Sequence, residues 1–479
     1  MARINQEKQH HPPRFTLSPR PPAARFAPKV PVREQITSRA PASLASRQTA
    51  VTSPLDTARH DHVHRPHRPT ARPTGARSIR YVLLQATAPT RRRKKAPKRA
   101  PVNVAFVLDR SGSMAGTKLA LAKYAVERAL TGLAPRDRFA IVTYDDHIET
   151  VVASCLASPA NKTKALLRLQ DVDARGSTDL HGGWTAGADA IKAHLSPDGV
   201  NRCLLLTDGL ANHGVTDAAE LAAFAADLRA SSIGTSTFGV GQDFDETLLT
   251  AIADAGGGHF YFVERPEQIP DYMTSELGEL RDTVAREVTI EVTHAPELEV
   301  EPFSPVAAAV GVPGIQRLLI GDLVVGQKVE VVLRVRFPDM PEGAHTTAFF
   351  TIGDRDGVLK ADGCTLAWTH DSHAANDAQP RDRDVDRAVA AIHAARARTE
   401  AVRLNRLGEY RGARHALRNV ASRIEDYAGS DASLQELSAQ LVAEEAAFSA
   451  PMQELDRKRA HYRSANVQRS RDVDGQARR

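Results

Sequence analysis

Between residues 101 and 282, short apolar runs alternate with longer segments in which apolar residues recur every three or four positions. Such runs are typical of buried parallel strands, and the longer segments are typical of helices packed on a sheet. The runs predict strands at residues 102–108, 138–144, 148–153, 202–207, 235–240 and 259–263. The longer segments predict helices near residues 117–132, 161–170, 183–195, 217–230, 246–255 and 267–283. We therefore expect an α/β domain with a doubly wound, mostly parallel sheet.

The regions on either side of this domain have different patterns. Residues 283–370 contain alternating apolar and polar runs broken by Pro and Gly, which predicts an antiparallel β-sandwich. A strand predicted within residues 76–90 needs a sheet to join, and we expect it to pair with that sandwich. The helical period returns in residues 381–463 and predicts a C-terminal region of helical hairpins. The Arg- and Ser-rich residues 464–479 predict a disordered, frayed tail.

The N-terminal part of the chain is basic and rich in proline. Residues 1–75 hold 12 of the 28 prolines, so we expect a disordered tail there and a basic linker at residues 91–100. Residues 1–100 contain 22 Lys and Arg against 4 Asp and Glu, a net charge of +18, whereas residues 101–479 contain 41 against 54, a net charge of −13. Charge alone is compatible with contact to nucleic acid, an acidic membrane, an acidic partner or the body of the same chain. An organellar transit peptide or a wrongly assigned start codon would have a similar composition.

Other features of the sequence bear on the compartment. No run of about 18 apolar residues is present, so no membrane span is expected, and the N-terminus lacks the pattern of a signal peptide. Cys155, Cys203 and Cys364 are too few and too widely spaced for a disulfide framework or a CxxC zinc site. We therefore expect a cytoplasmic protein.

Oxygen-bearing side chains follow the first predicted strand directly. Residues 109–114 read DRSGSM, so that Asp109 supplies a charge while Ser111 and Ser113 supply two hydroxyls from one tight turn. A parallel sheet places this turn at the carboxyl edge of its strands, where open α/β proteins bind ligands. Hard divalent cations prefer oxygen ligands, and Mg²⁺ keeps open coordination positions when only one or two carboxylates bind it.

Two further loops are expected to meet this turn. Thr178 lies in the segment GSTDL at residues 176–180, and Asp208 follows a buried strand in the segment TDG at residues 207–209. The DxSGS turn, the distant Thr and the TDG segment together resemble the metal-ion-dependent adhesion site of von Willebrand factor type A domains. The resemblance extends over residues 76–282, and its flanking sequences are similar to those of bacterial cytoplasmic members.

The resemblance implies a role for each of the five residues. Ser111, Ser113 and Thr178 would be direct ligands of Mg²⁺, or of Mn²⁺ or Ca²⁺, whereas Asp109 and Asp208 would act directly or through water. It also implies a non-enzymatic protein-interaction module or scaffold, in which an Asp or Glu of a protein partner completes the coordination shell. Members of this family often work beside AAA+ ATPases, which suggests one class of partner. The chain itself has no Walker A loop.

Two other functions are compatible with parts of the sequence. The basic tail would suit a nucleic-acid-tethered adaptor, although Phe15 and Phe26 are its only aromatic residues before Tyr81, which leaves salt-sensitive, nonspecific contact. Deleting residues 1–75 would separate this function from that of the metal site. A metal-dependent hydrolase would need a second metal, a positioned His base or an activated nucleophile, and none is evident.

Several residues near the metal loops have two interpretations. Residues 145–147 (DDH) follow a strand and would suit an acid/base group, but a polar turn is the simpler interpretation. His181 and His213 lie close to the loops and would either line the rim or be solvated. Trp184 begins a predicted helix, and core packing is its expected role.

Overall fold

The structure is a computed structural model, and it describes residues 44–45, 51–52, 78–90, 99–309, 312–338, 340–359, 363–371, 380–472 and 474–479. The predicted disordered segment 1–75 lies outside these residues except for two short strands, β1 (Leu44–Ala45) and β2 (Val51–Thr52). The prediction of disorder in residues 1–75 stays a prediction, and both strands pair antiparallel with β3 (Ser78–Thr87). The edge of β3 explains this, because its backbone N–H and C=O groups can be satisfied by an extended segment. The predicted linker lies outside as well, apart from residues 99 and 100.

A six-stranded sheet with the order β6-β5-β4-β7-β8-β9 forms the centre of the domain that was predicted at residues 101–282. Its strands are β4 (Val102–Asp109), β5 (Arg138–Tyr144), β6 (Ile148–Leu156), β7 (Val200–Thr207), β8 (Ile233–Val240) and β9 (Gly257–Val263). Neighbouring strands are parallel except β5 and β6, which are antiparallel. The prediction of a doubly wound, mostly parallel sheet is confirmed, and each predicted strand lies within an observed one.

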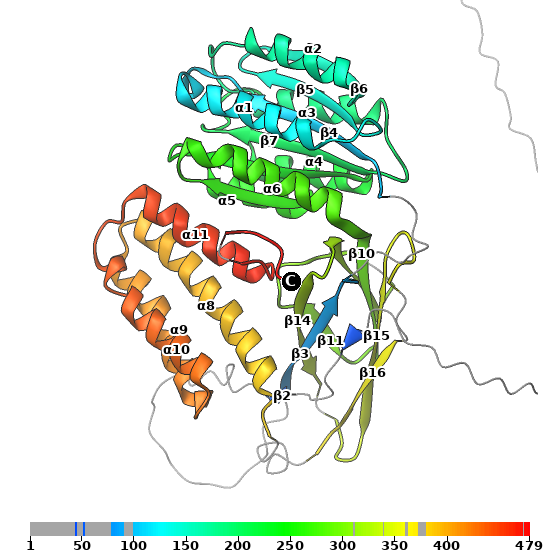
Figure 1. The fold of residues 1–479 in the computed structure, drawn as a ribbon. Helices are drawn as coiled ribbons and strands as arrows, with labels where there is room; N and C mark the ends of the chain where they lie inside the picture. Colours follow the sequence, from blue (N-terminus) through cyan, green and yellow to red (C-terminus); the bar gives the residue numbers. More distant parts are fainter. Residues whose placement is uncertain are drawn as a thin grey trace, which may run out of the picture. The chain divides into compact units, whose positions relative to one another are not determined.

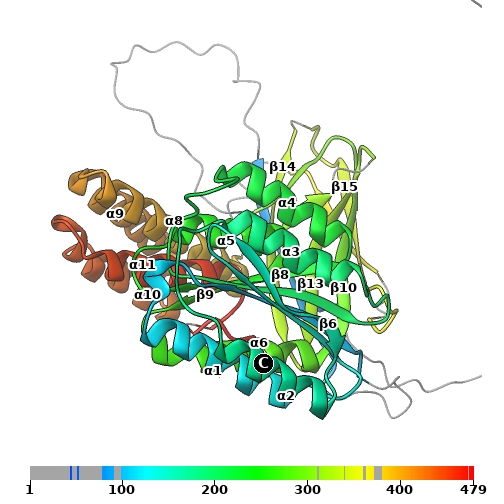
Figure 2. The ribbon, with the colours of Figure 1, turned by 90° about the horizontal axis from the view of Figure 1, so that it is seen from above.

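Helices cover both faces of this sheet (Figures 1 and 2). One face packs against α1 (Thr117–Gly132), α2 (Pro159–Gln170) and α6 (Ile269–Asp282). The other face packs against α3 (Leu180–Lys192), α4 (Ala218–Ala230) and α5 (Glu246–Ala255). Side chains of β4 alternate between the two cores, because Phe106 and Leu108 belong to the first and Ala105 and Val107 to the second. This two-sided burial explains the apolar run at residues 102–108, which only Asn103 interrupts.

Helix α3 approaches the sheet closely at Gly183. A Cβ atom at Gly183 would lie 2.4 Å from Cγ of Tyr144, which is buried. We expect Gly183→Ala to lower the free energy of unfolding by about 1–3 kcal/mol, because α3 must move away from the sheet. Urea denaturation measures the loss, and Gly278→Ala in α6 is the matched control, since a Cβ there meets nothing within 4 Å. A Gly183→Ala protein as stable as the wild type would contradict this close packing.

Strands on both sides of the central domain in sequence form a β-sandwich. One sheet has the order β1-β3-β14-β11, with β2 also paired to β3, and the other has the order β12-β13-β10-β15-β16. The strands that follow the central domain are β10 (Thr283–His294), β11 (Glu299–Pro302), β12 (Ala307–Ala309), β13 (Ile315–Val324), β14 (Lys328–Phe337), β15 (His345–Gly353) and β16 (Cys364–Thr369). β3 pairs antiparallel with β14 through ten residue pairs. The central domain is therefore inserted into the sandwich.

In the described residues that follow the sandwich, the structure contains the α-helices α8 (Arg383–Arg406), α9 (Tyr410–Ala428), α10 (Ala432–Glu444) and α11 (Glu454–Gln468). Helix α8 shares a hydrophobic core with two strands of the sandwich, in which Val389 of α8 packs in one cluster with Tyr81 and Leu83 of β3 and Val332 of β14. The opposite face of these strands packs inside the sandwich, so both sides of this sheet are covered. Within the parts of the chain that the structure describes, no helix is long and apolar enough to cross a membrane.

The C-terminal residues are ordered, so the prediction of a frayed tail at residues 464–479 is wrong. Helix α11 continues to Gln468, and Ser470 and Arg471 are buried. Residues 469–472 and 474–479, which we call the C-terminal strap, lie at the junction of the central domain and the sandwich. The strap is ordered because its arginines meet acidic side chains of the central domain, where Arg471 binds Glu279 at 2.6 Å and Arg469 binds Asp254.

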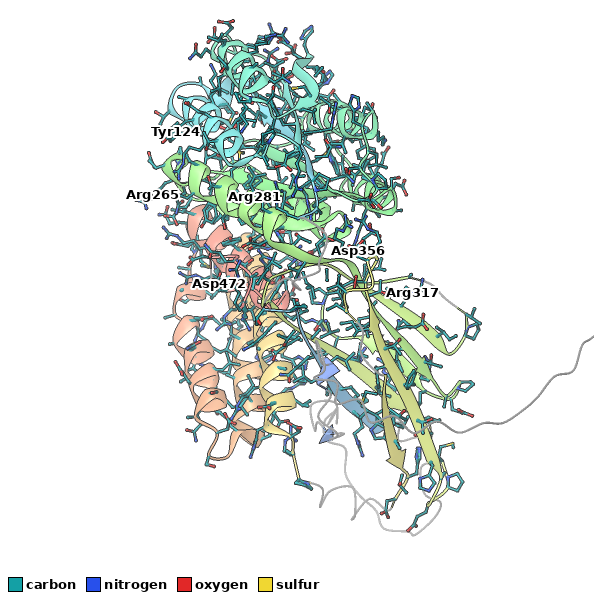
Figure 3. The ribbon with its side chains drawn as sticks, turned by 45° about the vertical axis from the view of Figure 1, so that its right-hand side comes forward. Tyr124, Arg265, Arg281, Arg317, Asp356 and Asp472 are labelled. Carbon is teal, nitrogen blue, oxygen red and sulfur yellow. The ribbon has the colours of Figure 1, made fainter. Side chains whose placement is uncertain are left out.

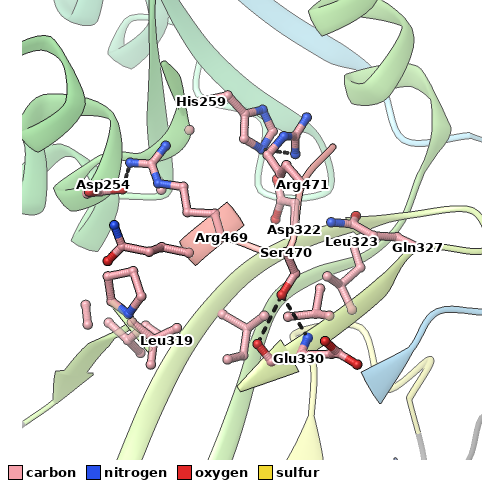
Figure 4. A pocket seen from close by; sticks show the side chains of 18 of the residues that line it. Asp254, His259, Leu319, Asp322, Leu323, Gln327, Glu330, Arg469, Ser470 and Arg471 are labelled. Atoms are coloured by element: carbon pink, nitrogen blue, oxygen red, sulfur yellow. Dashed lines mark hydrogen bonds and ion pairs between the residues drawn. The ribbon is translucent and has the colours of Figure 1, made fainter. Parts of the chain in front are cut away.

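The C-terminal strap also contacts the sandwich. The hydroxyl of Ser470 donates to the backbone carbonyl of Glu330 in β14 at 3.1 Å, and it accepts the backbone N–H of the same residue, also at 3.1 Å (Figure 4). The strap, the sandwich, the end of α5 and the beginning of β9 line a cavity of about 110 Å³. The strap therefore connects the central domain to the sandwich through side chains as well as backbone.

Polar contacts from the sandwich reach the central domain directly. Arg286 of β10 and Arg355 each donate to the backbone carbonyl of Gly199, at 3.0 Å and 3.1 Å. Arg286 also binds Asp356, which Figure 3 labels, with 2.6 Å between Nη2 and Oδ1. These contacts fix the turn that leads into β7, the strand that ends at the candidate site.

Candidate metal site

The predicted ligands lie at the carboxyl ends of two neighbouring strands and on the loop before α3. β4 and β7 are parallel, and Leu108 pairs with Leu206, so Asp109 and Asp208 leave the sheet at neighbouring positions. Thr178 lies two residues before α3, whose first turn is capped by the side chain of Asp179. The sheet thus determines where two of the three loops start, and the helix cap determines where the third ends.

Asp109 shapes the turn that follows β4. One of its carboxylate oxygens accepts the backbone N–H of Ser111 at 2.8 Å, and the other accepts the hydroxyl of Thr207 at 2.7 Å. The chain then forms a short 3-10 helix, Gly112–Met114, and Met114 is buried in the core beneath it. The turn is therefore held by hydrogen bonds on one side and by apolar packing on the other.

The hydroxyls of this turn contact the second loop. Ser111 Oγ and Ser113 Oγ lie 3.1 Å apart, and Ser113 Oγ donates to Oδ1 of Asp208 at 2.6 Å. Thr207, next to Asp208 in the chain, bonds Asp109 as described above. The loops after β4 and β7 are thus joined by direct side-chain contacts.

Thr178 reaches the same place from the third loop. A Cβ atom on Gly209 would lie 3.8 Å from Ser113 Oγ and 3.8 Å from Thr178 Oγ1, so both hydroxyls border the same side of that glycine. A backbone hydrogen bond of 3.1 Å from the N–H of Gly112 to the carbonyl of Gly176 holds the third loop against the first. The structure therefore brings together all five residues predicted from the sequence.

Burial makes the charges of this cluster energetically important. Asp109 and Asp208 are fully buried, Ser111 and Thr178 are nearly so, and Ser113 is exposed. Burial raises the pKa of Asp109 to about 6, and the charge of Asp208 adds to this, although hydrogen bonds from Thr207 and Ser111 favour the charged form. Two buried carboxylates and three hydroxyls, of which only that of Ser113 is exposed, form an all-oxygen donor set, which fits a hard divalent cation.

One contact of this cluster is not evident from the sequence. The ammonium group of Lys118, in the first turn of α1, forms an ion pair with Oδ2 of Asp208. Lys118 follows the DxSGS turn by only a few residues, so its proximity in sequence was the available signal. A lysine on the first turn of an amphipathic helix is usually a solvated surface residue, which is why this signal is weak.

Residues 145–147 are part of the loop structure beside the site. Asp145 is fully buried and accepts hydrogen bonds from Arg110 at 3.1 Å and from Arg175 at 2.7 Å. Burial opposes its charged form, but hydrogen bonds from Arg175 and the backbone of His147, together with the charge of Arg110, hold the pKa of Asp145 below its usual value. A turn fixed by ion pairs accounts for these residues better than an acid/base group.

The other residues with two interpretations are also accounted for. Trp184 is fully buried and donates to the hydroxyl of Thr235 at 3.2 Å, so its predicted core role is confirmed. The ring of His181 packs edge-on against Phe224, with 4.9 Å between centroids. His213 is exposed, and its Nδ1 lies 3.7 Å from a carboxylate oxygen of Asp179.

The fold and the cluster together define an α/β domain whose parallel sheet carries an oxygen-rich group of side chains at its carboxyl edge. Residues 103–275 match the sequence model of the von Willebrand factor type A domain family. This part of the chain is therefore a von Willebrand factor type A domain.

Relatives of the chain occur in bacteria and in mammals. YfbK of Escherichia coli strain K12, described as uncharacterized, is 29% identical over 196 residues, which are 40% of this chain and 34% of YfbK. Inter-alpha-trypsin inhibitor heavy chain H1 of Bos taurus is 27% identical over 194 residues, which are 39% of this chain and 21% of the bovine chain. The aligned parts thus span about a third or less of these relatives.

A solved structure shares more of the fold. The von Willebrand factor type A protein from Catenulispora acidiphila aligns with a TM-score of 0.61 and 18% identity, over 79% of this chain and 94% of that one. The alignment covers more of the chain than residues 103–275 contain, so the likeness in fold extends beyond the central domain.

Proposed function

We propose that the central domain is a non-enzymatic, cation-dependent protein-interaction module with the metal-ion-dependent adhesion site of its family. The cation, which we take to be Mg²⁺ with Mn²⁺ or Ca²⁺ as alternatives, would be held by Asp109, Ser111, Ser113, Thr178 and Asp208. The observation that carries the proposal is the convergence of these five side chains, from three loops, at the carboxyl edge of the sheet. When bound, the cation would supply a positively charged position for an Asp or Glu of the partner.

The protein's own residues prepare the site for this role. Thr207 and the backbone N–H of Ser111 orient the carboxylate of Asp109, and Ser113 orients that of Asp208. Burial of both carboxylates keeps water away from their inner sides, whereas the exposed Ser113 marks the side open to a partner. A partner's carboxylate would approach from this open side.

The wider context supports a bacterial cytoplasmic type of module. Cys155, Cys203 and Cys364 are all free in the structure, which agrees with a reducing compartment. YfbK is a bacterial relative, and von Willebrand factor type A domains are commonly interaction modules. We propose that the inserted domain presents the partner-binding site and that the sandwich and helices serve as its scaffold.

Metal removal tests the proposal. In the full chain, calorimetric titration is expected to give one Mg²⁺ or Mn²⁺ site, and Asp109→Ala combined with Ser111→Ala should weaken it by about 100-fold or more, because a charged and a neutral ligand are lost together. Affinity purification in Mg²⁺ should capture a protein partner that EDTA releases and that the double variant does not retain.

The matched control changes the same residue types elsewhere. Asp271→Ala combined with Ser275→Ala alters α6, where Asp271 contacts Arg128 rather than the metal loops, and should bind the cation and the partner like the wild type. Capture that is unchanged in EDTA, or equal in the double variant and the wild type, would overturn the proposal.

A further inference from the structure

The ion pair between Lys118 and Asp208 places a fixed positive charge inside the proposed cation site. The ammonium group binds Oδ2 of Asp208, while Oδ1 of the same carboxylate accepts the hydroxyl of Ser113 at 2.6 Å. Asp208 is fully buried, and the side chain of Lys118 is 27% exposed. Both oxygens of this carboxylate are therefore engaged by the protein itself.

Lys118 stands apart from the other cationic side chains nearby. Arg110 and Arg175 are bound to Asp145, and Arg110 also binds Glu149 at 2.8 Å. In the described part of the chain, Lys118 is the one cationic side chain that contacts any of the five proposed ligands. Of the cationic groups nearby, the ammonium group of Lys118 would therefore lie closest to a bound cation and to an incoming carboxylate.

We propose that Lys118 is a positioning residue that weakens binding of the divalent cation and strengthens binding of the partner's carboxylate. This inference rests on the proposed function of the same site. Asp109 and Asp208 formally balance the two charges of the cation, so the loaded site without Lys118 would be neutral. Lys118 adds one positive charge, and a single carboxylate then neutralises the loaded site.

The two effects have opposite signs because one charge acts on both ligands. The positive charge of Lys118 repels a divalent cation and competes with it for Asp208, so removing the charge should tighten cation binding. The same charge attracts a carboxylate, so removing it should weaken anion binding. A residue that only held Asp208 in place would behave differently, because its loss would weaken both.

The test uses the full chain, Mn²⁺ as the cation and acetate as the carboxylate probe. Free Mn²⁺ is measured by electron paramagnetic resonance during titration. Acetate binding to the loaded protein is measured by the loss of water-proton relaxation enhancement, as acetate displaces water from the bound ion. For Lys118→Met we expect Mn²⁺ affinity about tenfold higher and acetate affinity about tenfold lower than in the wild type.

Two further variants are the controls. Lys118→Arg keeps the charge and should bind Mn²⁺ and acetate within about twofold of the wild type. Lys123→Met removes a lysine of the same helix that donates to the carbonyl of Gln170, away from the site, and should change neither affinity.

The outcomes separate this inference from the proposed function. If Lys118→Met loses affinity for both Mn²⁺ and acetate, or changes neither, the role proposed for Lys118 is wrong while the metal site stands. If the wild type binds no Mn²⁺, or if Asp109→Ala combined with Ser111→Ala binds it equally well, the proposed function fails and this inference fails with it.

Discussion

Replacement of Arg471 by alanine is expected to lower the free energy of unfolding by about 3–5 kcal/mol, because it leaves a buried carboxylate without its partner. Two hydrogen bonds of 2.6 Å join Nη2 of Arg471 to the carboxylate of Glu279, and both side chains are less than 10% exposed. Nη1 of Arg471 also lies 2.8 Å from Nε2 of His259 in β9. The substitution therefore removes the main polar anchor of the C-terminal strap.

Urea denaturation followed by tryptophan fluorescence measures this loss. Trp184 lies in the central domain and Trp368 in the sandwich, so the two modules can be followed in Trp→Phe backgrounds. Removing both partners, with Arg471→Ala and Glu279→Ala together, should cost less than the sum of the single changes, since no unpaired charge is left behind. A single Arg471→Ala protein as stable as the wild type would show that the strap does not hold the modules together.

A second large effect is expected at low pH, through Glu246 at the start of α5. Burial alone would raise its pKa, but hydrogen bonds and charge from Lys458, with a further hydrogen bond from Arg406, lower the pKa of Glu246 to about 2 from an ordinary value of 4.5. Lys458 is only 1% exposed and its Nζ lies 2.8 Å from Oε2 of Glu246. This pair anchors α11 to the central domain.

The direction of the pH effect follows from the lowered pKa. The folded state favours the deprotonated carboxylate, so its stabilisation is fully present above pH 4.5 and is lost as the pH falls toward 2. The stability difference between wild type and Glu246→Gln should be about 3 kcal/mol at pH 7 and about 2 kcal/mol at pH 3.5. Urea denaturation at the two pH values measures both differences.

An exposed carboxylate provides the comparison for this prediction. Asp271 is 78% exposed in its contact with Arg128, so Asp271→Asn should change stability little at either pH. A difference between wild type and Glu246→Gln that stays constant from pH 7 to pH 3.5 would mean that the Lys458 pair does not lower the pKa of Glu246.

The sequence predicted the central domain well because its pattern is periodic and local. The first helix, Thr117–Gly132, and the fifth, Glu246–Ala255, begin and end at the predicted residues. Helix α3 begins at Leu180 instead of residue 183, because Asp179 caps it by accepting the N–H of Gly182 at 2.9 Å. Such a cap depends on one side chain, and a pattern of hydrophobic periodicity does not reveal it.

The C-terminal strap could not be predicted in this way. Its Arg- and Ser-rich composition is typical of a solvated tail, and its order depends on Glu279, Asp254 and Glu330, which are distant in sequence. A buried arginine is energetically acceptable only where an acidic partner is already fixed. Because only the tertiary structure fixes that acidic partner, composition alone wrongly predicted a disordered tail.

The candidate site was predicted through its five oxygen-bearing side chains, which the structure places together. Lys118 was missed because a motif identifies the residues that supply ligand atoms, whereas Lys118 acts on the site through Asp208. The ion pairs of Arg110 and Arg175 with Asp145 were missed for a similar reason, since they support the loops without supplying a ligand.

The insertion of the central domain between β3 and β10 has a practical consequence for recombinant work. A fragment that starts at residue 101 would lack β3, and the ten residue pairs that β3 makes with β14 would be lost. β14 would then present a long, apolar strand edge with unsatisfied backbone groups, which is a template for intermolecular pairing and aggregation. Soluble expression of the downstream modules therefore requires the strand that precedes the inserted domain.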